Sequence, residues 1–140
     1  MADLSERVRT VDGIEHPVQV GQVVLLQPGR RVRGGESADA QDGRALEVID
    51  LRSLSPLDTE TIVASVRRTG RCVVVHEAVV TGGIGAEIAA RVTEECFYNL
   101  EAPVLRVGAY TTPYPPSRLE EHYLPDLDRI LDAVDRTLSY

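Results

Sequence analysis

The stretch Cys72-Val73-Val74-Val75 is apolar on both faces of a pleated strand, which predicts a central strand covered from both sides. It leads through His76-Glu77 and the glycine-rich turn Gly82-Gly83-Ile84-Gly85 to a second apolar pattern. There the apolar positions are spaced as on one face of an α-helix: Ile88, Ala89, Val92 and Cys96. A buried strand, a tight turn and an amphipathic helix in this order indicate one half of a βαβ unit.

Further strands and helices are predicted on both sides of this unit. Before it, the β-branched run Leu46–Leu51 predicts a strand, and a helix should follow that ends at Gly70. Ser55 is the expected N-cap of that helix and Pro56 its first residue. After the unit, the expected elements are a strand at Val104–Val107, a proline-rich surface crossing at Thr112–Pro116 and a helix that starts near Pro125-Asp126 and reaches Leu138. Alternating strands and helices predict an α/β fold, a three-layer αβα domain with a mostly parallel sheet.

The N-terminal part of the chain is less regular. Residues 1–21 are polar and show no sustained period, so we expect a flexible arm there. Val23–Leu26 is a short apolar run that Pro28-Gly29 ends, which predicts a strand. The following segment carries Arg30, Arg31 and Arg33 and is typical of a solvated loop. The expected domain therefore spans residues 22–140.

Composition restricts the class of protein. The 140 residues, 43% of them hydrophobic, suffice for one core, and the net charge of −7 disfavours nucleic acid as a partner. No run of eighteen apolar residues and no signal-peptide pattern occurs, so we expect no membrane contact and a cytoplasmic location. All fifteen basic residues are arginines, which excludes a lysine Schiff base and a P-loop. Cys72 and Cys96 follow no metal-ligand spacing and are expected to be buried thiols.

Two groups of residues could carry chemistry. The glycines Gly82, Gly83 and Gly85 lie between a strand and a helix, where backbone amides can bind a phosphate. Their spacing departs from the dinucleotide fingerprint, so a tight turn that lets the helix dock is the simpler interpretation. His76 and Glu77, at a predicted strand end, could form an acid/base pair, or else a polar loop or a subunit contact. No serine or cysteine nucleophile stands in a recognisable elbow.

The last 21 residues are strongly acidic. Glu120, Glu121, Asp126, Asp128, Asp132 and Asp135 oppose only Arg129 and Arg136. Helix capping and solubility explain part of this excess. An acidic face that docks a basic partner is the alternative explanation.

Six segments from residue 44 onward occur together in an order that points to a known family: Glu47–Asp58, Val73–Glu77, Thr81–Ile88, Leu100–Val104, Thr112–Pro115 and Leu124–Asp126. In this order they resemble the C-terminal domain of the β subunit of 2-oxo acid dehydrogenase E1 components, which belong to the transketolase superfamily. The resemblance covers about two thirds of the chain.

The resemblance implies an αβα domain that does no chemistry itself, which leaves open whether this chain is an enzyme. In the family, thiamine diphosphate and Mg²⁺ bind between E1α and the N-terminal domain of E1β, so no cofactor is expected on this chain alone. The C-terminal domain packs subunits into a heterotetramer of two α and two β subunits. It also contacts the peripheral subunit-binding domain of the E2 acyltransferase, and the resemblance places Glu101 and the terminal carboxylate of Tyr140 in that contact.

The sequence departs from the family pattern in three places. The thiamine-binding domain has no counterpart in these residues. In the family an apolar strand and the first half of a helix would follow Val32, whereas here Arg33-Gly34-Gly35 continues into residues 36–43, which resemble the end of that helix. Without this first core strand the domain is expected to be marginally stable unless Val23–Leu26 takes its place. Finally, Thr111-Thr112 stand where relatives often carry an aspartate.

The predicted function is subunit assembly and E2 docking, as part of a β subunit in a dehydrogenase that oxidatively decarboxylates branched-chain 2-oxo acids or pyruvate. The expected partners are E1α, a second E1β and the subunit-binding domain of E2. Three alternatives stay open: a small-anion-binding or regulatory module that uses the glycine turn, an inactive remnant, and an enzyme that uses His76 and Glu77.

Overall fold

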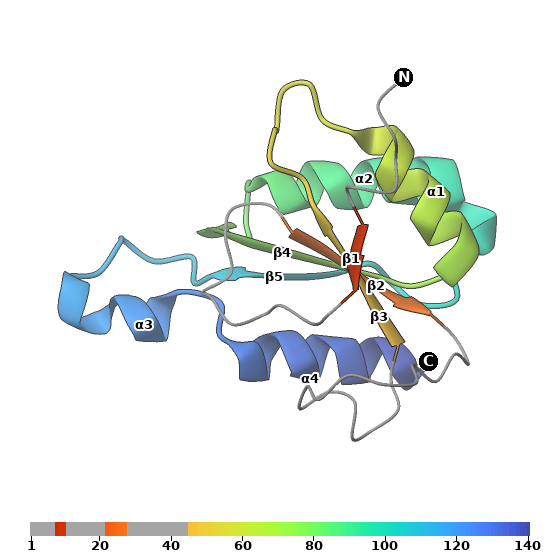
Figure 1. Cartoon of the computed structure of the whole chain (residues 1–140). Helices are drawn as coiled ribbons and strands as arrows, with labels where there is room; N and C mark the ends of the chain where they lie inside the picture. The colour runs from red at the N-terminus through yellow and green to blue at the C-terminus, as the bar shows by residue number, and fades with distance from the viewer. Residues whose placement is uncertain (1–7, 11–21, 28–44) are drawn as a thin grey trace.

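A computed structural model describes residues 8–10, 22–27 and 45–140 of the chain (Figure 1). The strands are β1 (Val8–Thr10), β2 (Gln22–Gln27), β3 (Ala45–Asp50), β4 (Cys72–Val79) and β5 (Leu105–Ala109). The helices are α1 (Thr59–Thr69), α2 (Ile84–Cys96), α3 (Glu120–Tyr123) and α4 (Leu127–Leu138), with short 3-10 helices η3 (Phe97–Asn99) and η4 (Ser117–Leu119). None of these described helices combines the length and the apolar character that a membrane crossing requires.

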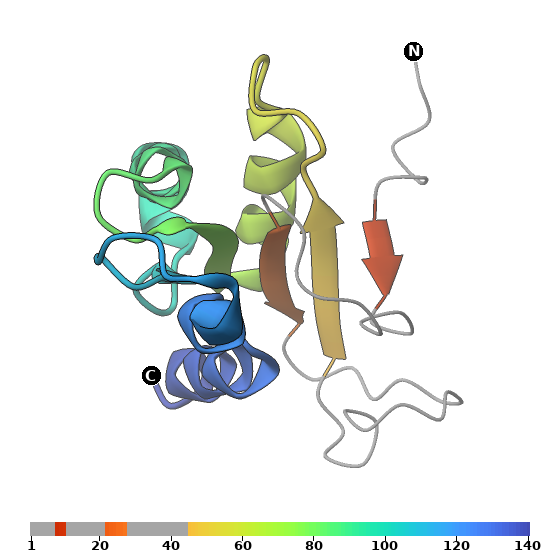
Figure 2. The same cartoon turned by 90° about the vertical axis from the view of Figure 1, so that its left-hand side faces the viewer.

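The elements form three layers, as predicted. The sheet has the order β1-β3-β2-β4-β5, with α1 and α2 on one face and α4 on the other (Figure 2). Along β4, Cys72 and Val74 join the core under α1 and α2, while Val73 and Val75 join the core under α4. All four side chains are fully buried, so β4 is the central, doubly covered strand that its sequence predicts.

The strand directions correct the prediction of a mostly parallel sheet. β4 and β5 pair in parallel, but β2 is antiparallel to both β3 and β4, and β1 is antiparallel to β3. The strands that helices connect, β3, β4 and β5, do run in one direction, as crossover connections require. The prediction fails for β1 and β2 because no described helix leads from either of them to the next strand in the chain.

β2 occupies the middle of the sheet. Val23 pairs with Ile49 on one side and Val74 on the other, and Val24 pairs with Val48 and Val73. The segment Val23–Leu26 thus lies between β3 and β4, where it supplies the core position that a missing strand would leave empty. Residues 30–43 fall outside the described residues. The arginines Arg30, Arg31 and Arg33 lie in this segment, and so does the place where a family strand is expected to be missing. Val8–Thr10, inside the expected arm, form an edge strand.

The structure confirms two predicted helix boundaries and corrects a third. Gly70 ends α1 with φ 70°, and Asp126 caps α4 by accepting a hydrogen bond from the Arg129 amide at 2.8 Å. α1, however, begins at Thr59 rather than at Pro56. Leu54 and Leu57 pair across a tight turn that contains Ser55 and Pro56. The N-cap is therefore Asp58, whose carboxylate accepts from the Thr61 amide and hydroxyl.

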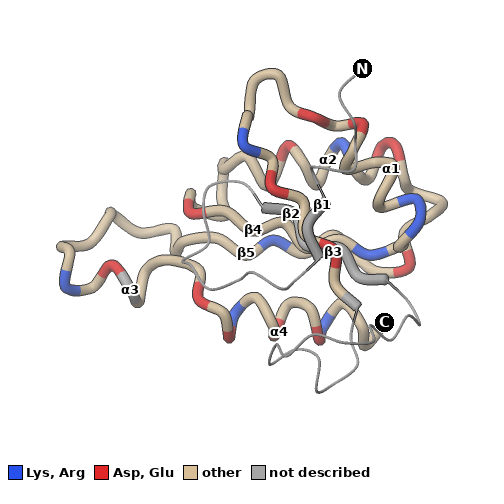
Figure 3. The backbone as a smooth tube through the Cα atoms, viewed as in Figure 1, with Lys and Arg blue, Asp and Glu red and all other residues tan. Residues whose placement is uncertain are grey.

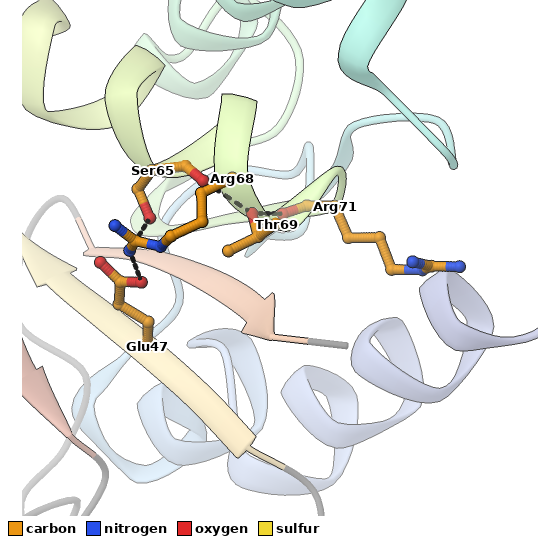
Figure 4. Close-up of polar contacts among 5 residues, drawn as sticks. All are labelled: Glu47, Ser65, Arg68, Thr69 and Arg71. Atoms are coloured by element: carbon orange, nitrogen blue, oxygen red, sulfur yellow. Dashed lines mark hydrogen bonds and ion pairs between the residues drawn. The ribbon is translucent and has the colours of Figure 1, made fainter. Parts of the chain in front are cut away.

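A buried carboxylate connects α1 to the sheet (Figure 4). Glu47 on β3 is 2% exposed and forms an ion pair with Arg68, whose guanidinium also donates to the Ser65 hydroxyl at 3.2 Å. A buried charge is tolerated when it is paired in this way. In the sequence, Glu47 is a single glutamate inside an apolar strand, and the sequence analysis did not predict that its side chain is buried.

Candidate functional site

Glu101 lies at a junction of three elements. Its amide donates to the carbonyl of Gly70 at 2.8 Å, just after α1, and its carboxylate forms an ion pair with Arg71. Arg71 also donates from Nε to the carbonyl of Thr137 near the end of α4, at 3.1 Å. The Glu101 side chain is 55% exposed and that of Arg71 only 14%. Arg71 therefore holds an accessible carboxylate in a fixed place, beside the end of α4.

This junction brings the two predicted docking residues to the same part of the molecule. Tyr140 is exposed and lies three residues beyond Thr137, which Arg71 contacts. Asp128, Asp132 and Asp135 are exposed and follow one another at helical spacing on α4, a helix on which Figure 3 marks several acidic residues. The acidic excess of the last 21 residues thus lies partly on α4, whose last turn contacts Arg71, the partner of Glu101. The sequence analysis did not predict a role for Arg71. Its only signal was its place between Gly70, which ends a helix, and the buried strand that starts at Cys72.

The glycine turn before α2 is shaped by close packing. A Cβ atom on Gly83 would lie 2.3 Å from the Val79 carbonyl oxygen, and one on Gly85 would lie 2.4 Å from Nε2 of His76. The space that side chains would take at these two glycines is therefore occupied by protein atoms. Gly82, with φ +75° and open space around it, provides the left-handed turn. This geometry favours the tight-turn interpretation over a phosphate cradle.

His76 and Glu77 do not form an acid/base pair. β4 extends to Val79, so both residues lie inside the strand rather than at its end, which corrects the predicted position. The His76 ring is 1% exposed and packs against the glycine turn of α2. Glu77, by contrast, is close enough to Tyr114 to affect its titration: a hydrogen bond to Glu120, with a smaller contribution from Glu77, raises the pKa of Tyr114 to about 12. The two neighbouring side chains thus lie in different environments: His76 packs against the glycine turn, and Glu77 lies near Tyr114.

Neither ring nitrogen of His76 has a hydrogen-bond partner within the described residues. Burial lowers the pKa of His76, the nearby backbone of Ala78 partly opposes this, and the positive charge of Arg106 lowers the pKa further. The Ala78 backbone is close to the ring, but its geometry does not amount to a hydrogen bond. His76 is therefore a neutral, buried side chain at neutral pH.

Mild acid is expected to destabilise the chain through His76. The folded-state pKa lies below the ordinary value of 6.5, so the unfolded chain binds a proton first as the pH falls. The contribution of His76 to the free energy of unfolding is complete above pH 6.5 and decreases as the pH falls from there towards the folded-state pKa. Urea unfolding of His76→Gln should show a flatter loss of stability in this range than the parent chain. The exposed His122, changed to Gln, is the control, and equal slopes for the parent and His76→Gln would contradict this role.

An open groove of about 880 Å³ lies elsewhere, between the outer side of α2 and β5. Its lining is mostly small and apolar: Ala86, Ala89, Ala90, Thr93, Glu94, Phe97, Leu100, Ala102, Pro103, Val104 and Arg106. Sequence reasoning missed this groove, although the spacing of its alanines on α2 was a visible signal.

The described residues do not fit thiamine diphosphate. Its diphosphate needs cationic or metal partners, but the charged residues that line the groove are a single arginine and a single glutamate, Arg106 and Glu94. In the part of the chain that the structure describes, no group of three or more His, Cys, Asp or Glu residues could hold a metal ion. In the glycine turn, atoms of Val79 and His76 occupy the positions that Cβ atoms on Gly83 and Gly85 would take.

The sequence model of the family described as "Transketolase, C-terminal domain" matches residues 36–130. The chain is 59% identical, over 74% of its length, to 3-methyl-2-oxobutanoate dehydrogenase subunit beta of Mycobacterium tuberculosis, of which it covers 30%. It is 55% identical, over 93% of its length, to pyruvate dehydrogenase E1 component subunit beta of Leifsonia xyli, of which it covers 42%. It is 47% identical, over 84% of its length, to 2-oxoisovalerate dehydrogenase subunit beta of Pseudomonas aeruginosa, of which it covers 33%.

The chain thus spans between 30% and 42% of these relatives. The names confirm the resemblance to β subunits of branched-chain 2-oxo acid and pyruvate dehydrogenases. The three layers agree with the expected fold. Because the family match extends over more than half of the residues and the described fold agrees with it, the chain belongs to the transketolase C-terminal domain family.

Proposed function

We propose that this chain acts as the C-terminal segment of an E1 β subunit, which assembles with E1α and a second E1β and docks the peripheral subunit-binding domain of E2. The reaction of the complete complex would be the thiamine-dependent oxidative decarboxylation of branched-chain 2-oxo acids or pyruvate. In this proposal residues 22–140 act as the domain, and the arm of residues 1–21 contributes strand β1. The buried free thiols Cys72 and Cys96 support a cytoplasmic location.

The observation that carries the docking proposal is the Glu101 carboxylate, half exposed and held by Arg71 beside the end of α4. Arg71 contacts Oε2, and a carboxylate can accept several hydrogen bonds at once, so Glu101 retains the capacity to bind a basic side chain of a partner. The aspartates along α4 add a negative field that attracts a basic surface and increases the rate of encounter. The proposal leaves catalysis to the parts of the complex outside this chain.

Removing the charge of Glu101 should weaken E2 docking. Calorimetric titration of the chain with an isolated E2 subunit-binding domain is expected to give a Kd that is at least about tenfold higher for Glu101→Arg, with a smaller increase for Glu101→Gln. The glutamine variant matters because an arginine at position 101 would also repel Arg71, whereas glutamine keeps the shape of the side chain.

The matched control is Glu87→Arg, because Glu87 is a similarly exposed glutamate that pairs with an arginine, Arg91. Its Kd for the E2 domain should equal that of the parent chain. Circular dichroism checks that each variant is folded. If both Glu101 variants bind the E2 domain as tightly as the parent chain, Glu101 has no part in docking.

A further inference from the structure

The end of β4 that leads to α2 has an irregular place in the sheet (Figure 1). In the described part of the sheet, pairing of β4 with β2 reaches Val75. Pairing with β5 shifts register between Val75, opposite Val107, and Val79, opposite Ala109. Residues 76–78 of β4 thus stand against the single Gly108 of β5, as in a β-bulge. A strand segment with an interrupted ladder opens more easily than a regular one.

The turn after this segment has few contacts of its own. Thr81 and Gly82 are exposed, and a Cβ atom on Gly82 would meet open space. Gly83, the N-cap of α2, makes no side-chain capping bond, and the Ala86 amide donates to its carbonyl at 3.0 Å. The N-terminal end of α2 therefore depends on the side chain that packs beneath it.

That side chain is His76, whose ring contacts the turn, the helix and β5. A Cβ atom on Gly85 would lie 2.4 Å from Nε2, and Cβ atoms on Gly83 and Gly108 would lie 2.8 Å and 3.1 Å from Cε1. The ring is 1% exposed, and neither of its nitrogens has a hydrogen-bond partner within the described residues. The packing therefore suits a neutral ring and offers a proton on either nitrogen no acceptor.

The charges around the ring also disfavour a proton on it. The charged residues on the surrounding elements are Arg106 of β5, Glu87 of α2, Glu77 of β4 itself and Arg129 of α4, which donates to the Gly108 carbonyl. The Glu87 carboxylate is about half exposed and pairs with Arg91, and Glu77 lies near Tyr114. Neither carboxylate accepts a hydrogen bond from His76. The free amides in the first turn of α2 add a positive partial charge.

We propose that His76 is a pH-dependent switch for the N-terminal end of α2. The neutral ring holds the turn and the first turn of the helix against β4. In mild acid a solvent proton binds to the free ring nitrogen, the imidazolium moves out to water, and residues 79–87 open while the rest of the sheet stays folded. Opening breaks the bond from Arg106 to the Val80 carbonyl and the bond between the Thr81 and Thr111 hydroxyls.

This switch is separate from the proposed assembly and E2 docking, and its test needs the full chain alone. It also differs from a general loss of stability, because a local opening exposes little surface. Urea accelerates hydrogen exchange in proportion to the surface that opening exposes. Exchange measured at several low urea concentrations therefore separates the local opening from global unfolding.

The test is amide hydrogen exchange followed by NMR at about pH 7.5 and about pH 5.5, corrected for the intrinsic pH dependence of exchange. The opening constant for the amides of residues 86–88 should rise by at least about threefold in acid. Its upper limit is about tenfold, because the opened His76 titrates near the ordinary pKa of 6.5. Low urea should leave these amides unchanged, whereas exchange of Val73–Val75, in the central strand, should increase with urea.

Two variants remove the titrating ring. His76→Phe keeps an aromatic ring without the unpaired nitrogens, and His76→Gln keeps a polar side chain, so a folding defect in one leaves the other to decide. Both should show the same opening constant at the two pH values. The control His122→Gln changes an exposed histidine and should respond to pH as the parent chain does. Three results would overturn the switch: an equal opening constant at both pH values in the parent chain, a pH response that persists without His76, or a urea dependence at residues 86–88 equal to that at Val73–Val75.

Discussion

A chain in which Val24 is replaced by proline is expected to lose cooperative folding. Val24 lies in the middle of β2, where its backbone pairs with Val48 of β3 and with Val73 of β4. Proline removes the amide hydrogen and does not fit a strand with a neighbour on each side. Disrupted pairing with both neighbouring strands is a large loss for a small domain, whose total stability is about 5–15 kcal/mol. Urea unfolding followed by circular dichroism should show no cooperative transition.

The matched control is a chain that lacks residues 1–21. This deletion removes the edge strand β1 and leaves β2 intact, so the chain should keep a cooperative transition with a lower midpoint. The comparison separates the loss of a central strand from the loss of an edge strand. If Val24→Pro unfolds at the same urea concentration as the parent chain, β2 does not lie between β3 and β4.

The position of β2 also bears on the relation between this chain and its relatives. The alignment with the Leifsonia xyli protein extends over 143 positions, more than the 140 residues of the chain, so that relative has residues without a counterpart here. A deletion inside a domain usually exposes a strand edge, which promotes aggregation. Here a short apolar segment from the N-terminal side, Gln22–Gln27, fills the gap between β3 and β4. The described part of the sheet is therefore continuous from β1 to β5.

The parts of the fold that could be predicted are those with strong local patterns. The doubly apolar β4, the helical spacing in α2 and α4 and the glycine at the end of α1 each led to an element of the correct type. The direction of β2 could not be predicted, because the apolar run of four residues, Val23–Leu26, reads the same in either orientation and its partners lie 20 or more residues away. Only tertiary pairing decides that direction.

In the candidate site, too, local sequence patterns predicted some features, while features that depend on tertiary contacts could not be predicted. The resemblance singled out Glu101, but the partner that holds it, Arg71, becomes visible only when α1, η3 and α4 meet in space. In the same way, His76 looked like a residue at an exposed strand end, whereas β4 continues for three more residues and the turn before α2 covers its ring. Sequence spacing predicts which residues share an element, while burial and pairing depend on elements that are distant in the chain.

Replacing Gly83 by alanine is expected to destabilise the chain by about 3 kcal/mol or more. The new Cβ atom would lie 2.3 Å from the carbonyl oxygen of Val79, a backbone atom that cannot move without shifting β4. Gly82→Ala is the matched control in the same turn: its side chain would meet open space, and the cost is about 1 kcal/mol for the left-handed conformation alone. Urea unfolding of the two variants measures the difference.

Gly85→Ala tests whether the turn is glycine-rich because of His76. Alanine favours a helix over glycine by about 1 kcal/mol, but here its Cβ atom would lie 2.4 Å from Nε2 of His76, so the variant should be less stable than the parent. Adding His76→Ala should relieve this clash, whereas it should not rescue Gly83→Ala, because there the closest atom belongs to the backbone. A double-mutant cycle therefore predicts strong coupling between positions 76 and 85 and weaker coupling between positions 76 and 83. Additive effects for the first pair would mean that the His76 ring does not determine the need for glycine at position 85.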